Sequence, residues 1–163
     1  MPRTLIAGFG NVLRGDDGFG VEVIRRLERE GIANEQTVLL EVGTGGVALA
    51  QALVIPFGRL IVLDAIQREG VAGNLYVLKV DAVEALRSID MHMAVPSRAL
   101  GLAQVLGVLP PDVLLVGCEP LETEEFSMQL SAPVSAAADR AVGVITRLLA
   151  ANDALIAGEP VRG

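Results

Sequence analysis

Short apolar runs alternate with segments of helical periodicity along most of the chain. The apolar runs are rich in Val, Leu and Ile and end at glycines, prolines or charged residues, which is typical of strands buried on both faces. We expect such strands over residues 5–7, 37–42, 60–64, 75–80 and 113–118.

The segments between the apolar runs carry helical spacing. In the first of them, Val21, Ile24 and Leu27 recur on one face, and Gly31 provides an end for the helix. In the last, Ser131 is placed to cap the helix and Pro133 falls in its first turn. We expect helices over residues 19–30, 47–53 and 96–107, and one that begins after Ser131.

This order of elements predicts an α/β fold: a single-domain three-layer α/β/α sandwich around a mostly parallel five-stranded sheet. The length of 163 residues suits one domain over residues 1–163, with a flexible tail after about residue 152. Ligands bind such sheets beyond the carboxyl ends of the strands. The strand ends are therefore where chemistry is expected.

Composition excludes several classes of function. Lys and Arg total 13 against 20 Asp and Glu, a net charge of −7, and only 3% of residues are aromatic. Neither value favours nucleic-acid binding. No stretch is long and apolar enough for a membrane-spanning helix, and the N-terminus lacks a signal peptide pattern. The single cysteine, Cys118, excludes an internal disulfide and fits a cytoplasmic protein.

Three side chains with metal-binding chemistry lie near predicted strand ends. Asp17 follows the first strand, Asp64 ends the third, and His92, the only histidine, precedes the helix that starts at Pro96. Two carboxylates and one imidazole suit a divalent transition metal of borderline hardness and leave coordination positions open. The sequence thus predicts a metal-contacting cluster at one edge of the sheet.

Each of these residues also has a simpler interpretation. Asp16 and Asp17 fit caps of the following helix, and Asp64 fits a turn in which its side chain accepts a backbone N–H. His92 alone fits an ordinary, partly exposed histidine. Cys118, at the end of an apolar strand, fits a core position better than that of a catalytic nucleophile.

The Gly8-Phe9-Gly10 turn after the first strand suggests a second class of function, a Rossmann-like nucleotide-binding module. Glu41, at the end of the second strand, would then contact the ribose. Leu13 stands where the third glycine of that fingerprint belongs, and the acidic pair Asp16 and Asp17 would repel a pyrophosphate. The nucleotide-binding interpretation remains the alternative.

The ordered set of motifs resembles the hydrogenase maturation protease family over about residues 3 to 150. The strongest motif is the segment at residues 8–20, with the sequence GFGNVLRGDDGFG. The others are EVGTGG at 41–46, LDA at 63–65, HMAVPSRALGLA at 92–103, VGCEP at 116–120 and LSAPV at 130–134.

The resemblance implies an endopeptidase that removes a C-terminal extension from the large subunit precursor of [NiFe] hydrogenases. It also implies recognition of nickel that is already bound in the precursor, so no permanently bound catalytic metal is expected. The residues of the family that contact nickel fall on Asp17, Asp64 and His92. The precursor is then the expected partner, with no nucleic acid or membrane, and we expect a monomer because so large a substrate needs open access.

Two questions stay open at the level of sequence. Either Asp16 or Asp17 is placed to act as the general base that activates water. A third class of function is a self-sufficient metallohydrolase that holds its own metal and cleaves small peptides.

Overall fold

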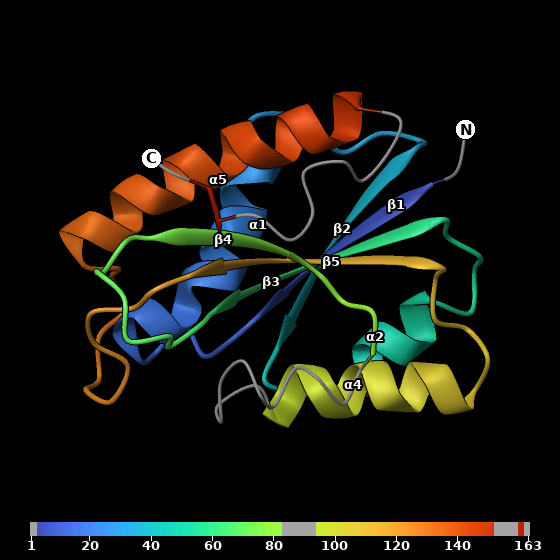
Figure 1. Ribbon diagram of the computed structural model, residues 1–163, viewed down its shortest axis with the longest axis horizontal. Helices are drawn as coiled ribbons and strands as arrows, with labels where there is room; N and C mark the ends of the chain where they lie inside the picture. The colour runs from blue at the N-terminus through green and yellow to red at the C-terminus, as the bar shows by residue number, and fades with distance from the viewer. Residues whose placement is uncertain (1–2, 83–93, 152–159, 162–163) are drawn as a thin grey trace.

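The computed structural model describes residues 3–82, 94–151 and 160–161, and these form one twisted sheet with helices on both faces (Figure 1). The strand order is β2-β1-β3-β5-β4-β6. The strands are β1 (Thr4–Phe9), β2 (Thr37–Gly43), β3 (Arg59–Ala65), β4 (Leu75–Lys79), β5 (Asp112–Cys118) and β6 (Pro160–Val161).

The helices make up the two outer layers. They are α1 (Phe19–Arg29), α2 (Val47–Ala52), α4 (Ala94–Val105) and α5 (Ala132–Ala150), and a 3₁₀ turn, η1 (Gly15–Gly18), precedes α1. Helices α1 and α5 cover one face of the sheet, whereas α2 and α4 cover the other (Figure 1). This confirms the three-layer α/β sandwich. Among the described helices, none is long and apolar enough to cross a membrane.

The sheet is mostly parallel, as expected, but β4 runs antiparallel to β5 and carries the two-residue β6 on its outer side. The reason is the connection from β3 to β4, which contains no helix. A parallel neighbour requires a crossover that returns the chain to the opposite edge of the sheet. Strand β4 instead starts at the edge where β3 ends. The predicted flexible tail lies largely outside the described residues.

Two apolar cores lie on either side of the sheet, and alternate residues of each strand contribute to them. On β1, Ile6 packs toward α1 and α5, whereas its neighbours Leu5 and Ala7 pack toward α2 and α4. All three side chains are fully buried. The strands are therefore apolar throughout because both faces are covered, which explains the continuous runs in the sequence.

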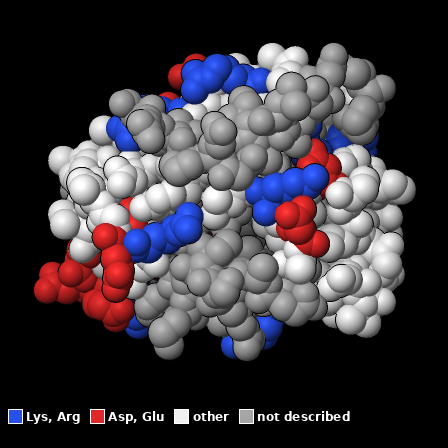
Figure 2. All heavy atoms as spheres, viewed as in Figure 1, with Lys and Arg blue, Asp and Glu red and all other residues white. Residues whose placement is uncertain are grey.

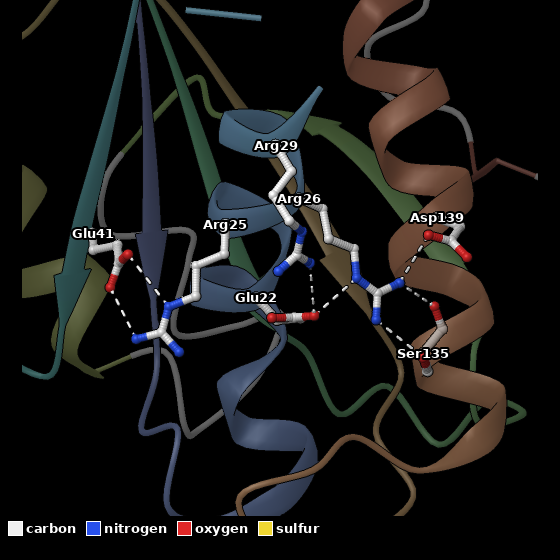
Figure 3. Close-up of polar contacts among 7 residues, drawn as sticks. All are labelled: Glu22, Arg25, Arg26, Arg29, Glu41, Ser135 and Asp139. Atoms are coloured by element: carbon white, nitrogen blue, oxygen red, sulfur yellow. Dashed lines mark hydrogen bonds and ion pairs between the residues drawn. The ribbon is translucent and has the colours of Figure 1, made fainter. Parts of the chain in front are cut away.

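Helices α1 and α5 are also joined by a polar contact centred on Arg26 (Figure 3). Its guanidinium donates to a carboxylate oxygen of Glu22 at 2.9 Å and to a carboxylate oxygen of Asp139 at 2.9 Å. It donates in addition to the carbonyl of Ser135 at 2.7 Å and to the hydroxyl of the same residue at 3.0 Å. This arrangement fixes how α5 lies across α1.

Candidate functional site

The candidate site lies at the carboxyl ends of β1 and β3, which are neighbours in the sheet. From β1 the chain continues to β2 on one side, and β3 is followed by strands on the other side. Such a switch point is where doubly wound sheets bind ligands. A pocket of about 230 Å³ opens here, and its lining includes Gly10, Asp17 and Asp64.

Asp17 is positioned by the η1 turn, immediately beyond β1. One of its carboxylate oxygens accepts the backbone N–H of Asn11 at 2.8 Å. Gly10 lies beneath it with φ of +117°, and a Cβ at that position would overlap the carbonyl of Asp17. Only glycine therefore lets the chain turn here and keep Asp17 over the end of β1.

Asp64 approaches the same place from β3. Its side chain is 6% exposed, and its Oδ1 accepts the N–H of Ala65 at 2.8 Å. The same oxygen lies 3.5 Å from where a Cβ of Gly10 would be, so both aspartates lie next to this glycine. The local contact predicted for Asp64 is present, and it does not prevent the side chain from lining the pocket.

His92 lies outside the described residues. The helix that follows it, α4, begins beside the pocket, where Val95 and Pro96 contribute to the lining. Among the residues that the structure describes, no three His, Cys, Asp or Glu side chains lie close enough to hold a metal ion. The structure thus brings Asp17 and Asp64 together, and the three-residue cluster stays a prediction.

Asp16 has a different role from its neighbour. It is 1% exposed, and its carboxylate accepts four hydrogen bonds from the connection between β5 and α5. The donors are the N–H groups of Leu121, Glu122 and Ser131, and the hydroxyl of Ser131. With its oxygens occupied in this way, Asp16 holds a loop in place, and it does not line the pocket as a general base would.

These contacts also correct the capping predictions. The residue at the N-terminus of α1 is Gly18, which has no side-chain hydrogen bond, so neither Asp16 nor Asp17 caps that helix. Ser131 does occupy the cap position of α5, but its hydroxyl donates to Asp16 and caps no backbone N–H. Long-range partners have replaced the local ones that the sequence pattern favoured.

Glu119 is a third buried carboxylate, besides Asp16 and Asp64, and sequence reasoning made no prediction of its role. It is 4% exposed and accepts hydrogen bonds from the N–H groups of Arg68 and Gly70 and from the hydroxyl of Tyr76 at 2.8 Å. Burial and this hydrogen bond raise the pKa of Tyr76. Glu119 thereby fixes the β3–β4 connection. The only sequence signal for it was its position directly after a strand.

Cys118 is fully buried at the end of β5. Burial, followed by the nearby charge of Asp16, raises the pKa of its thiol to about 12. A nucleophilic cysteine needs a lowered pKa and access to substrate. The core interpretation of Cys118 is therefore correct.

The two features that favoured nucleotide binding, Glu41 and the Gly8-Phe9-Gly10 turn, both have a structural explanation. Glu41 pairs with Arg25 at 3.3 Å, so an ion pair on the surface accounts for this carboxylate (Figure 3). Gly10 serves the turn over which Asp17 lies, and a Cβ on Gly8 would overlap the carbonyl of Gly20 in α1. Both glycines are explained by backbone packing.

The fold and the site together define a class: a doubly wound α/β protein with two aspartates in a pocket at the switch point of its sheet. Comparison with known proteins narrows this class. The model of one family, described as hydrogenase maturation protease, matches residues 21–148. That range includes Asp64 and His92 and begins just after Asp17.

Individual relatives extend the match over the N-terminal motif. The hydrogenase expression/formation protein HupD of Rhizobium leguminosarum bv. viciae is 30% identical over 162 residues, which cover 98% of this chain and 80% of HupD. The hydrogenase expression/formation protein HoxM of Cupriavidus necator is 34% identical over 138 residues, which cover 83% of this chain and 68% of HoxM.

Solved structures agree with these relatives. The hydrogenase maturating endopeptidase HybD from E. coli superposes with a TM-score of 0.79 at 27% identity, covering 91% of this chain and 92% of HybD. The [NiFe] hydrogenase maturation protease HybD from Thermococcus kodakarensis gives a TM-score of 0.77 at 27% identity, with 90% and 98% covered.

The chain therefore belongs to the hydrogenase maturation protease family. It is an endopeptidase and hence a hydrolase. Proteins of this family act on the large subunit precursor of nickel-containing hydrogenases. The family, the fold and the enzyme class expected from the sequence are all confirmed.

Proposed function

We propose that this protein removes the C-terminal extension of a [NiFe] hydrogenase large subunit precursor by one cut, after recognising nickel that the precursor carries. In this proposal Asp17, Asp64 and His92 contact the nickel. The observation that carries the proposal is the pocket at the switch point of the sheet, which Asp17 lines from the turn after β1 and Asp64 lines from β3. The placement of Val95 and Pro96 in the same pocket, three and four positions after His92, supports the third contact.

The chemistry of the donor set explains why nickel would serve as a recognition element. Two carboxylates and one imidazole supply hard and intermediate ligands and leave coordination positions for other groups. In the proposal, ligands from the precursor complete the coordination, so the full set forms only in the complex. Cleavage is then restricted to nickel-loaded precursor by a shared metal, and a deep side-chain pocket is not needed.

The same pocket supplies groups for peptide hydrolysis. A metal ion beside the scissile bond polarises its carbonyl. Of the two neighbouring acids, Asp17 is the one that lines the pocket, whereas Asp16 accepts four hydrogen bonds elsewhere. We therefore assign to Asp17, and not to Asp16, any transfer of a proton from the attacking water.

The composition of the chain bears on where the protein works and on what it binds. We propose that the protein works in the cytoplasm, as a monomer, with the precursor as its partner and with neither nucleic acid nor membrane. The single buried cysteine and the net charge of −7 support this setting. A monomer leaves the pocket accessible to a large folded substrate.

The proposal predicts a difference between folded and unstructured substrates. The protein should cut its nickel-loaded cognate precursor once, close to the C-terminus, as measured by intact mass spectrometry. A synthetic peptide that spans the same bond should stay uncut, because it brings no nickel centre. Protein purified without added metal should contain far less than one metal ion per chain, as measured by elemental analysis.

Rapid cleavage of the peptide, together with stoichiometric metal in the purified protein, would instead identify a self-sufficient metallohydrolase. Failure to cut a verified cognate precursor would reject the proposed substrate.

A further inference from the structure

The connection between β5 and α5 exposes large apolar side chains beside the candidate site. We call residues 121–130 the docking loop. In it, Leu121, Phe126 and Met128 are 64%, 77% and 73% exposed, and Leu13 from the neighbouring β1–η1 segment is 43% exposed. Large apolar side chains that a loop exposes in this way are typical of interaction sites, and Phe and Met are enriched at the centres of interfaces.

Hydrogen bonds to its backbone hold the docking loop in a defined conformation with these side chains exposed. At its two ends, the buried carboxylate of Asp16 accepts the N–H groups of Leu121 and Ser131. In its middle, the N–H of Ser127 donates to the carbonyl of Leu13 at 2.9 Å, and the carbonyl of Ser127 accepts the N–H of Gly15 at 2.8 Å. An ordered loop with exposed apolar side chains loses little conformational entropy when a partner covers it, so it is suited to binding.

The loop is continuous with the candidate site. Pro120, Thr123 and Glu124 line the same pocket as Asp17 and Asp64. On the other side of the loop, Met128 lines a second cavity of about 340 Å³ against α1. A chain bound over the loop would therefore reach the pocket directly.

The loop is also acidic. Glu122, Glu124 and Glu125 are exposed, and Glu124 pairs with Arg14 at 3.8 Å, the one ion pair of these three among the described residues. Backbone N–H groups of Glu124 and Glu125 donate to the carboxylate of Glu122 and lower its pKa. Figure 2 shows acidic side chains gathered at the edge of the molecule where the β5–α5 connection lies in Figure 1.

We propose that the docking loop, with Leu13, binds a segment of the precursor that carries apolar and basic side chains and adjoins the bond to be cut. This inference rests on the proposed function. Apolar contacts with Leu121, Phe126 and Met128 supply most of the binding energy, as in other interfaces. The glutamates select basic neighbours and accelerate association.

A second group of exposed apolar residues lies on the α2 and α4 layer and provides a matched control. Ile55 and Val105 are 56% and 85% exposed, and neither lines the pocket. We assign this group no partner, since neither of these two residues lines the pocket. It tests whether any exposed apolar residue affects the reaction.

The first arm of the test measures kcat and KM of trimming for the Phe126→Ser, Met128→Ser and double variants with nickel-loaded precursor. We expect KM to rise about 10-fold for each single variant and further for the double, with kcat nearly unchanged. Thermal unfolding should not change, because both side chains are exposed. The controls Ile55→Ser and Val105→Ser should behave as wild type. Unchanged KM in the double variant, or equal effects in the controls, would overturn the docking proposal.

The second arm tests charge. Glu125→Lys should raise KM, and the KM of the wild-type protein should rise with salt more steeply than that of the variant. A KM that does not respond to this charge reversal would overturn the assignment of a basic partner segment.

A separate binding measurement distinguishes this proposal from the proposed function. If wild-type protein binds a verified precursor but does not cut it, the proposed function is wrong while the docking loop is still tested. Loss of binding in the Phe126→Ser/Met128→Ser variant would then support the docking loop, and unchanged binding would reject it.

Discussion

The Asp17→Asn and Asp64→Asn proteins are expected to trim nickel-loaded precursor at least about 1,000-fold more slowly than wild type. Each substitution preserves the size of the side chain and a carbonyl oxygen that can accept the N–H of Asn11 or of Ala65. Each removes one negative ligand from the proposed contact with nickel. Each factor of ten in rate corresponds to about 1.4 kcal/mol of transition-state stabilisation, so a loss of about 1,000-fold corresponds to about 4 kcal/mol. Single-turnover cleavage with excess enzyme is the measurement.

His92→Ala should show a loss of the same order, and normal cleavage by that protein would exclude the role assigned to His92. Glu41→Gln is the matched control, because Glu41 is an exposed carboxylate at the end of β2 that pairs with Arg25 and does not line the pocket. It should cut at the wild-type rate. Circular dichroism must show that every variant is folded. Wild-type rates for both Asp17→Asn and Asp64→Asn would refute the site.

Gly20→Ala is expected to destabilise the fold by about 3 kcal/mol, one of the largest effects of a single methyl group in this chain. Gly20 lies in the first turn of α1, close to the backbones of β1 and β3. A Cβ at this position would overlap the backbone carbonyls of Leu63 and Phe9. Backbone cannot move aside as a flexible side chain can, so α1 would have to shift away from the sheet. Urea denaturation measures the loss.

Gly101→Ala is the control for this prediction. Gly101 is also inside a helix, α4, but a Cβ there would meet no atom within 4 Å apart from its own helix and chain neighbours. Alanine should therefore leave stability unchanged or raise it by up to about 1 kcal/mol, through its higher helix propensity. Equal stability of the Gly20→Ala and wild-type proteins would show that α1 lies farther from the sheet than described.

The sequence predicted the order of elements well because the apolar pattern reflects burial directly. The run at residues 60–64 is buried on both faces and became β3, and the stripe of Val21, Ile24 and Leu27 became the buried side of α1. The pattern carried no information on the direction of β4. That direction depends on the connection from β3, and an apolar run has the same composition in a parallel and in an antiparallel neighbour.

The site was predictable in part for a similar reason. Asp17 and Asp64 were identified because strand ends converge at one edge of a parallel sheet. The structural roles of Asp16 and Glu119 were not, since their partners are remote in sequence. Asp16 binds N–H groups 105 and 115 positions away, and Glu119 binds the hydroxyl of Tyr76, 43 positions away. Sequence proximity instead favoured local capping by Asp16, which the fold does not use.

Recognition through nickel is tested most directly by a trimming assay on the cognate large subunit precursor in two forms, one loaded with nickel and one free of it. We expect that only the nickel-loaded form is shortened, and that adding nickel to the free form restores cleavage. Cleavage of both forms at the same rate would contradict recognition through nickel.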